Sequence, residues 1–401
     1  MDAPIESVVD QLRAARKAAR SFVICDAVQR NLLLCEIAKR LRAEVASVLA
    51  ENAIDVAALP DADPRKDRLL LTSERVMAIA DAVEAVTRLP EVLDEELEHR
   101  VMPSGIEVRR VRVPLGVVGC IYEARPNVTV DVATLCLRTG NAVILKGGRE
   151  AERTNRVLVV LMRDVLAQHH LPVALVTLLA PTHEAAEALM QADGLVDALI
   201  PRGSARLIQA VREKARVPVI ETGAGVCHIY VHADADLQQA AQIIENAKTR
   251  RVSVCNALDC LLVNRALVDE METLLSRCRA QGVTIHEAPE DWGTEWLSMN
   301  LSVRVVDTLD EALEHIAQYG SGHSEAILTR DEAAATRFCR EVDAACVYVN
   351  TPTSFTDGGE FGLGAEVGIS TQKLHARGPM GLAALTTFKW LIKSEGALRA
   401  K

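Results

Sequence analysis

The sequence lacks several features that would assign it to common protein classes. No stretch approaches the roughly 20 apolar residues of a membrane-spanning helix, and the first residues, MDAPIESVVDQLRAARKAARS, hold charges and no signal-peptide core. The ten cysteines include no Cys-x-x-Cys pair, which disfavours zinc ribbons and thioredoxin-type sites. The sequence shows no internal repeat and no low-complexity tract. We therefore expect a soluble, cytoplasmic protein with free thiols, no membrane partner and no metal.

Basic residues are also in deficit. The chain has 45 Lys and Arg against 55 Asp and Glu, a formal net charge of -10 and a pI near 5.6. This balance argues against a general nucleic-acid binder. An acidic protein that binds anions must gather its cations locally, and the Arg250–Arg251 pair is one such place. With 401 residues, 49% of them hydrophobic, the chain is expected to form two or three domains.

Apolar periodicity divides the chain into a helical start and two alternating blocks. Residues 5–58 and 69–89 show helical spacing. From about residue 106, strand and helix patterns alternate as far as the strand-like VPVIE at 217–221, and a second alternating block begins near residue 226. This rhythm predicts an α/β protein with parallel, doubly wound sheets that carry helices on both faces.

Three predicted strands of the first block end in residues suited to an anion. GVVGCIY leads into EARPN, AVILK ends in Lys146-Gly147-Gly148, and DALI leads into Pro201-Arg202-Gly203-Ser204. Ligands of open parallel sheets bind outside the carboxyl ends of strands, where glycines and helix N-termini accommodate phosphate. A nucleotide site is one interpretation. Ordinary turns with solvated cations are the alternative, because no Gly-x-Gly-x-x-Gly opens a helix after the first strand.

Cys255, in RRVSVCNALD, stands out among the cysteines because arginines precede it. Neighbouring guanidinium groups favour the thiolate, which is the nucleophilic form. The alternative is a small buried hydrophobe, as most free cysteines are; Cys260, inside CLLV, fits that description. A cysteine hydrolase would need a histidine base. His228 reads as a core residue of a strand, and His323 and His375 are weaker loop candidates.

Four stretches, at 114–148, 246–264, 321–331 and 355–382, resemble the aldehyde dehydrogenase superfamily and, more narrowly, its gamma-glutamyl phosphate reductase branch. The match extends along essentially the whole chain. It implies an aldehyde-dehydrogenase-like fold with a Rossmann-type NADPH-binding domain, a second α/β catalytic domain and a small oligomerisation hairpin, hence a homo-oligomer. The implied bounds are 1–100 and 115–225 for the cofactor domain, 226–365 for the catalytic domain, and 101–114 and 383–401 for the hairpin.

The resemblance also implies roles for individual residues. Cys255 matches the nucleophile, and Asn127 matches the oxyanion-hole asparagine, which would act with the Cys255 backbone N–H. Lys146 matches the cation at the adenosine ribose, where a 2′-phosphate would favour NADPH. Glu295 matches a carboxylate on the nicotinamide ribose, although a solvated acidic residue is an equal interpretation. Other cofactor-binding candidates are Gly147, Gly148, Arg202, Gly203 and Ser204, and the substrate-binding candidates are Arg125, Arg250, Arg251, His375 and Arg377, with Lys373 beside them.

The implied reaction is the NADPH-dependent reduction of L-glutamyl 5-phosphate to L-glutamate 5-semialdehyde, in proline biosynthesis. Phosphate leaves as a Cys255 thioester forms, no metal is needed, and functional coupling to glutamate 5-kinase is plausible because the acyl phosphate is unstable. One alternative is a hydrolytic aldehyde dehydrogenase that uses Glu221, in ETGAG, as the base. A cysteine hydrolase without nucleotide and a non-catalytic binding protein are further alternatives.

Three positions depart from the pattern of the branch. Arg250-Arg251-Val252-Ser253 replaces Gln-Arg-Pro-Ser before the cysteine, and Ser204 replaces the second glycine of Pro-Arg-Gly-Gly. Ser354 stands where an arginine usually precedes Phe-Thr-Asp-Gly-Gly. An arginine there could pair with the substrate carboxylate or phosphate, so its absence calls the substrate affinity into question. The charge of Arg250 offers one way to compensate for the loss.

Overall fold

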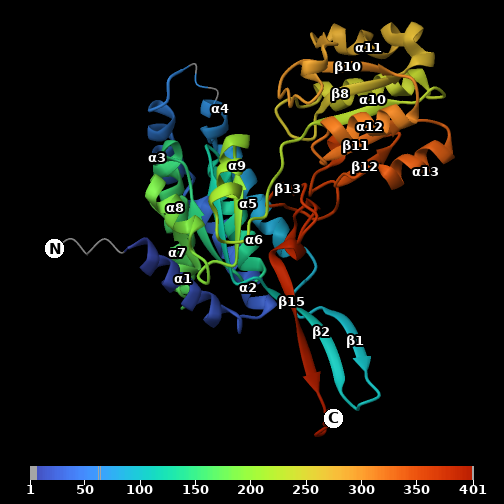
Figure 1. The fold of residues 1–401 in the computed structure, drawn as a ribbon. Helices are drawn as coiled ribbons and strands as arrows, with labels where there is room; N and C mark the ends of the chain where they lie inside the picture. Colours follow the sequence, from blue (N-terminus) through green and yellow to red (C-terminus); the bar gives the residue numbers. More distant parts are fainter. Residues whose placement is uncertain (1–6, 62, 64, 400–401) are drawn as a thin grey trace. The chain divides into compact units, whose positions relative to one another are not determined.

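The computed structural model describes residues 7–61, 63 and 65–399. Contacts within the chain separate two compact units (Figure 1). The first contains the described parts of 1–221, 362–368 and 380–401, and the second contains 222–361 and 369–379. The units divide between Glu221 and Thr222, whereas the sequence placed a boundary at 225. The cofactor-binding and catalytic roles assigned to the two domains remain predictions.

A four-stranded parallel sheet forms the centre of the first unit, in the order β5-β4-β3-β6. Its strands are β3 (Val117–Tyr122), β4 (Ala142–Lys146), β5 (Val176–Leu178) and β6 (Ala198–Arg202). Every residue of β3 is buried, which explains its unbroken apolar sequence, because a parallel strand is covered on both faces. The helices are α1 (Val8–Phe22), α2 (Ala27–Ala43), α3 (Val45–Ala57), α4 (Arg65–Leu69), α5 (Ser73–Thr87), α6 (Pro126–Arg138), α7 (Glu152–Gln168), α8 (His183–Met190) and α9 (Ala205–Lys214).

The predicted helical region 5–58 folds as three helices, α1 to α3, and its first two residues lie outside the described part of the chain. Asp26 begins α2 with a capping box, in which its side chain accepts the Gln29 backbone N–H and the Gln29 side chain accepts the Asp26 N–H. Such reciprocal bonds satisfy the free donors of a helix start. The cap explains why the helical pattern is interrupted at this point.

Helix α6 is held in the unit at its carboxyl end by a buried ion pair. Arg138 is 1% exposed, and its Nη1 lies 2.6 Å from Oε2 of Glu91. Arg30 shares that carboxylate at 3.0 Å and also donates to the Arg138 carbonyl oxygen. Two guanidinium groups around one carboxylate are costly to separate once buried, so the position of α6 is fixed.

A three-stranded antiparallel sheet joins distant parts of the first unit. Strand β2 (Glu107–Pro114) pairs with β1 (Glu96–Val101) on one side and with β15 (Thr386–Lys393) on the other. The sheet forms a long arm in Figure 1. The predicted hairpin, 101–114 and 383–401, therefore omits nearly all of β1, which falls within the predicted cofactor domain at 1–100. Residues 400–401 lie outside the described part.

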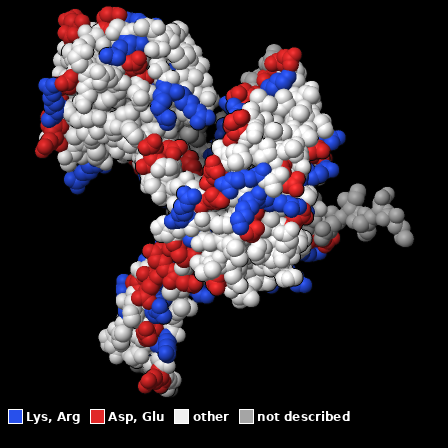
Figure 2. All heavy atoms as spheres, turned by 180° about the vertical axis from the view of Figure 1, so that it is seen from behind, with Lys and Arg blue, Asp and Glu red and all other residues white. Residues whose placement is uncertain are grey.

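The arginines that mark β2 in the sequence are paired rather than free in solvent. Arg112 Nε lies 2.9 Å from Glu95, and Arg109 Nε lies 2.5 Å from Glu96. Figure 2 shows acidic and basic side chains mixed along this arm. Exposed pairs of this kind contribute little stability, but they leave the arm without a strong charge of one sign.

The second unit is built on a six-stranded parallel sheet in the order β12-β11-β7-β8-β10-β9. The strands are β7 (Cys227–Val231), β8 (Leu258–Asn264), β9 (Thr284–His286), β10 (Asn300–Val306), β11 (Ser324–Leu328) and β12 (Cys346–Val349). The helices are α10 (Leu237–Thr249), α11 (Met271–Ala280), α12 (Leu309–Tyr319) and α13 (Glu332–Glu341), and a small ribbon joins β13 (Ile369–Ser370) to β14 (Gly378–Pro379).

Alternate residues of the central strands enter two separate cores of the second unit. Ile229 and Leu261 pack in one cluster, while Tyr230 and Cys260 pack in the other. This division follows from the two-residue period of a strand, which sends successive side chains to opposite faces. It confirms Cys260 as a core cysteine.

The doubly wound architecture is confirmed, with one correction. The predicted strand VPVIE reduces to a single bridge between Val219 and Leu199. Pro218 supplies no N–H for a ladder, and the Pro218 carbonyl instead accepts the Leu199 N–H. Among the described residues, no helix combines the length and apolarity needed to cross a membrane.

Candidate active site

Cys255 lies in the turn between α10 and β8 and is half-buried. The two elements are tied together beneath it. Lys248 Nζ, fully buried near the end of α10, donates to the Leu258 carbonyl at 2.8 Å and lies 3.7 Å from Asp259. Burial raises the pKa of Asp259 to about 7, against the opposing effect of Lys248. Lys248 therefore joins the end of α10 to the start of β8, which restrains the backbone of the turn that contains Cys255.

The backbone of Cys255 packs directly against the segment that leads into β7. A Cβ at Gly225 would overlap the Cys255 carbonyl oxygen, so only glycine fits there. Cys227 Sγ donates to the same carbonyl at 3.2 Å. Burial raises the pKa of the Cys227 thiol well above its ordinary value, and Glu325 adds to the effect. Cys227 thus stays a hydrogen-bond donor that holds the Cys255 backbone.

Glu295 lies beside this backbone and not in open solvent. Its Oε1 accepts the Gly225 N–H at 2.9 Å, and burial raises the pKa of its carboxyl. The interpretation of Glu295 as a solvated acidic residue is therefore wrong. Its second oxygen leaves capacity to accept from a ligand hydroxyl, and the role on a ribose remains a prediction.

The residue after Cys255 fastens the turn to a second loop. Asn256 Nδ2 donates to the carbonyls of Ser354 and Thr356, at 3.2 and 2.9 Å. Ser354, the residue that replaces an arginine, is buried and donates to Asn246 Oδ1 at 3.3 Å. Asn246 and Arg250 stand one helical turn apart at the end of α10. Compensation by Arg250 for the missing arginine remains a prediction.

The predicted substrate cations of the second unit fall into two groups. Arg250, the C-cap of α10, and Arg251 are exposed at the entrance to the Cys255 turn. Arg377 Nη2 instead lies 2.8 Å from Asp343, and Lys373 pairs with the same carboxylate. Two cations around one anion leave a single net positive charge there. His375, between them, is exposed with a φ of 67°.

In the first unit, the predicted cofactor residues share one edge of the sheet. Lys146 ends β4 and Arg202 ends β6, and the strand register places them beside the end of β3. Gly203 and Ser204 follow, with Ser204 as the N-cap of α9. Glu123 accepts the Ser204 N–H at 2.9 Å. These residues meet as expected for a ligand at the carboxyl ends of parallel strands.

The charges at this edge fit a dinucleotide. Lys146 is half-buried, and burial lowers its pKa, while Glu150 and Glu123 oppose the shift and Arg149 adds to it. Cations suit phosphate, and carboxylates suit ribose hydroxyls. A Cβ at Gly147 would meet the Asn155 amide, and one at Gly148 would meet the Glu150 carboxylate, so those side chains would have to shift if a larger residue stood there.

Asn127 and Arg125 lie at the start of α6. Arg125 is the N-cap and Pro126 the first helical residue, a position at which proline needs no N–H partner. Asn127 is exposed, and its Nδ2 donates to Asp131 Oδ2 at 2.9 Å, one turn along the helix. The amide is thereby oriented, and its second N–H stays available to a substrate oxygen.

The remaining candidate residues do not form a second centre. His228 is fully buried in β7, with Nδ1 3.0 Å from Glu325, as expected for a core histidine. His323, also buried, has its pKa lowered to about 4 by burial. Glu221 lies 3.6 Å from Arg212 within the first unit.

His228, Cys260 and His315 place ligand atoms within 4.8 Å of one another, but their surroundings do not suit a metal. Arg304 Nη1 donates to Nδ1 of His315 at 2.7 Å. The neutral ring must then carry its proton on Nε2, the atom that faces Cys260 at 3.6 Å. Metal-bound histidines show the opposite arrangement, with the outer nitrogen donating to an acceptor.

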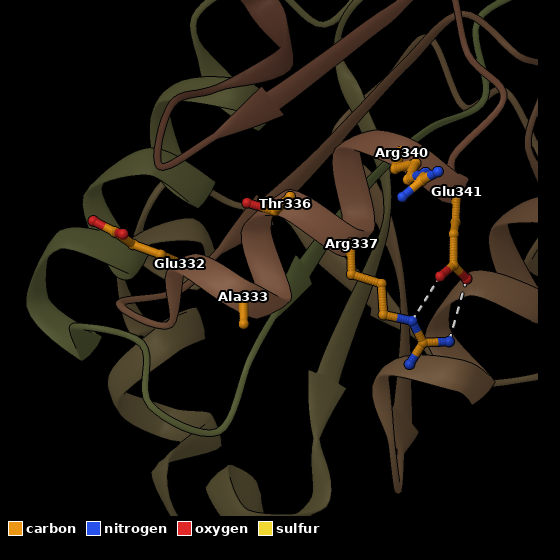
Figure 3. Close-up of a pocket in the computed structure, with 6 residues that line it drawn as sticks. All are labelled: Glu332, Ala333, Thr336, Arg337, Arg340 and Glu341. Atoms are coloured by element: carbon orange, nitrogen blue, oxygen red, sulfur yellow. Dashed lines mark hydrogen bonds and ion pairs between the residues drawn. The ribbon is translucent and has the colours of Figure 1, made fainter.

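A hollow on the surface of the second unit lies apart from these candidates. It is lined by residues of α13, among them Arg337, which pairs with Glu341 (Figure 3). None of the predicted site residues lines it. The predicted site is thus not this hollow.

Four residues of the candidate sites were not selected from the sequence: Arg149, Asp131, Gly225 and Cys227. Asp131 had a usable signal, because it follows Asn127 by four residues on a predicted helix. Arg149 follows Lys146-Gly147-Gly148 directly. Gly225 and Cys227 had none, since their contacts with Cys255 cross 30 and 28 positions of sequence.

Comparisons with known proteins agree with this arrangement. Residues 2–296 match the aldehyde dehydrogenase family. The chain is 48% identical to a gamma-glutamyl phosphate reductase of Phocaeicola vulgatus, across 98% of this chain and 100% of that protein. It is 48% identical to one of Thermobifida fusca, across 96% and 97%. The crystal structure of a Thermotoga maritima gamma-glutamyl phosphate reductase superposes with a TM-score of 0.95 at 37% identity, covering 98% and 100%.

The aldehyde-dehydrogenase-like α/β fold expected from the sequence is thereby confirmed. The nicotinamide cofactor common to that family, NAD or NADP, agrees with the charges at the sheet edge of the first unit. The chain belongs to the gamma-glutamyl phosphate reductases of the aldehyde dehydrogenase family.

Proposed function

We propose that this protein reduces L-glutamyl 5-phosphate to L-glutamate 5-semialdehyde with NADPH, releasing phosphate, as a step of proline biosynthesis. The observation that carries the proposal is the Cys255 turn. Cys255 is half-buried, and its carbonyl oxygen accepts a hydrogen bond from the Cys227 thiol. The same carbonyl leaves no room for a residue larger than glycine at position 225. Such fixation suits a nucleophile that must meet an acyl carbon in one geometry. The names of relatives that are 48% identical to this chain support the same substrate.

In this mechanism, the Cys255 thiolate, already without its proton, attacks the acyl carbon of the substrate. The bond to the phosphate oxygen breaks, phosphate leaves with its electron pair, and a thioester remains on Cys255. The Cys255 backbone N–H donates to the acyl oxygen as its charge develops, and Asn127 is the further donor that the family resemblance implies. NADPH, when bound, supplies the hydride that reduces the thioester. Cys255 then departs from the resulting thiohemiacetal, which releases the semialdehyde.

The arginines near Cys255 and at the start of α6 are the candidates to bind the phosphate and carboxylate groups of the substrate. Arg250 and Arg251 stand exposed before the Cys255 turn, and Arg125 stands at the start of α6. Guanidinium groups bind phosphate and carboxylate in paired hydrogen bonds. The loop that holds His375 and Arg377 is a weaker phosphate site, because Asp343 already neutralises part of its charge.

The test is the reverse reaction, because the acyl phosphate is labile. L-Glutamate 5-semialdehyde, NADP⁺ and phosphate are mixed with the protein, and formation of reduced nicotinamide is followed by absorbance. We expect product only when phosphate is present. Equal rates without phosphate would overturn the proposal and favour a hydrolytic aldehyde dehydrogenase with Glu221 as the base. Glu221→Gln would then lose activity, whereas the reductase should keep it.

Preference for NADPH over NADH is assigned to Lys146. Replacing this residue with alanine removes a half-buried ammonium group at the end of β4. A lost charge-assisted hydrogen bond to a 2′-phosphate corresponds to roughly a 10- to 100-fold higher KM for NADP⁺, with a much smaller change for NAD⁺. Lys214→Ala, on exposed α9 of the same unit, is the matched control. An equal loss for both cofactors would assign Lys146 a different role.

Two partner relations complete the proposal. Strand β15 is an edge of its sheet and exposes Phe388, Trp390, Leu391 and Ile392. An exposed apolar edge invites pairing with another chain, which supports a homo-oligomer.

Functional coupling to glutamate 5-kinase is proposed because the acyl phosphate is unstable in water. The free state of all ten cysteines agrees with a cytoplasmic location.

A further inference from the structure

Helix α6 is buried almost all round, and its accessible residues form a polar pair. Of its 13 residues, Pro126–Arg138, all are buried except Asn127 and Asp131. The two are four positions apart, so they lie on one face of the helix. Asn127 Nδ2 donates to Asp131 Oδ2 at 2.9 Å. An amide and a carboxylate are thus the accessible side chains of an otherwise buried helix.

The carboxylate of Asp131 has no counter-ion of its own. No Lys, Arg or His among the residues that the structure describes forms an ion pair with it, and Arg202 acts only through its longer-range charge. Burial raises the pKa of Asp131 to about 6, while the Asn127 hydrogen bond and Arg202 oppose the rise. The group is therefore ionised at neutral pH and above. A half-buried anion without a cation is unfavourable unless a ligand supplies the positive charge.

The substrate of the proposed reaction carries such a charge. Its α-ammonium nitrogen is four bonds of about 1.5 Å from the reacting carbonyl carbon, which is roughly 5 Å in the extended chain. A carbonyl oxygen bonded to the Asn127 amide lies within about 6 Å of a carboxylate bonded to the same amide, since each hydrogen bond spans about 2.9 Å. One extended amino-acid chain can therefore place its carbonyl oxygen on the Asn127 amide and its ammonium group within hydrogen-bond reach of the Asp131 carboxylate.

We propose that Asp131 binds the α-ammonium group of the substrate and thereby selects an amino-acid aldehyde over one that lacks the amine. This inference rests on the proposed function and adds a residue to it. Asn127 would bind the reacting end of the molecule and Asp131 the amino-acid end. The α-carboxylate of the substrate would be bound by the arginines assigned above, Arg125, Arg250 and Arg251.

The experiment compares two aldehydes in the reverse, phosphate-dependent assay. L-Glutamate 5-semialdehyde carries the α-ammonium group, and 5-oxopentanoate is the same chain without it. Wild type should prefer the amino acid by roughly 10- to 100-fold in kcat/KM, as expected for a charge-assisted hydrogen bond. D131N keeps the shape and an acceptor for Asn127, so it should lose this preference mainly through KM. Asp164→Asn, on the exposed face of α7, should retain it.

The outcomes separate the two proposals. Wild type inactive on L-glutamate 5-semialdehyde would refute the proposed function itself. An active wild type that uses both aldehydes equally would overturn the role of Asp131 without need of any variant. A D131N protein that loses kcat equally on both aldehydes, with the preference intact, would make Asp131 only a positioning residue for Asn127. A melting curve of each variant checks folding, and D131S provides a second substitution if D131N unfolds.

Discussion

Cys255→Ser is expected to abolish phosphate-dependent formation of reduced nicotinamide. A serine hydroxyl is a far weaker nucleophile than a thiolate near neutral pH. Loss of a catalytic nucleophile typically lowers kcat by about 10³-fold or more. The rate with L-glutamate 5-semialdehyde, NADP⁺ and phosphate measures the effect directly.

The matched control is Cys339→Ser, because Cys339 is an exposed cysteine on α13 of the same unit. This variant should keep the wild-type rate. Both proteins should melt at nearly the same temperature as wild type, since neither change alters the core. Residual activity of the Cys255 variant within tenfold of wild type would exclude a thioester on this residue.

Gly225→Ala should also have a large effect, although residue 225 performs no chemistry. The new methyl group would overlap the Cys255 carbonyl oxygen, and a backbone atom cannot rotate away as a side chain can. Overpacking of this kind costs roughly 1–3 kcal/mol of stability. Displacement of a nucleophile by about 1 Å lowers the rate by about 100-fold. We expect the loss mainly in kcat, with little change in the KM for NADP⁺.

Gly293→Ala is the control for this substitution. Gly293 lies in the second unit as well, and a Cβ there meets Tyr319 at an ordinary contact distance of 3.6 Å. It should keep both activity and melting temperature. If Gly225→Ala were as active as Gly293→Ala, the turn would have to move freely, and the proposed fixation of Cys255 by its neighbours would be wrong.

The loop that contains Lys373 and Arg377 illustrates a charge pattern that the sequence overstates. Read along the chain, STQKLHARGPMG is a basic turn. In the structure, Asp343 pairs with both cations. A residue 30 positions earlier in the sequence thus decides how much positive charge a ligand would meet. Charge counts within a segment cannot include such a partner.

The sequence alone determined the family, the alternation of strands and helices, and the position of Cys255 between α10 and β8. These properties are local, because periodicity and turn chemistry act over a few residues, and long motifs are specific in themselves. The same holds for Lys146 and Arg202, since parallel strands bring their carboxyl ends to one edge of a sheet. Asn127 was selected by its motif, and its helix was expected.

Tertiary structure decided what surrounds those residues. It placed Gly225 and Cys227 against the Cys255 carbonyl, brought Glu295 to the Gly225 N–H, and left Asp131 as a carboxylate without a counter-ion. It also added β1 to the sheet of β2 and β15 and reduced VPVIE to one bridge. Each of these outcomes depends on contacts between segments that are distant in sequence, or on burial by the whole unit. Packing and desolvation of that kind leave no periodic trace in the chain itself.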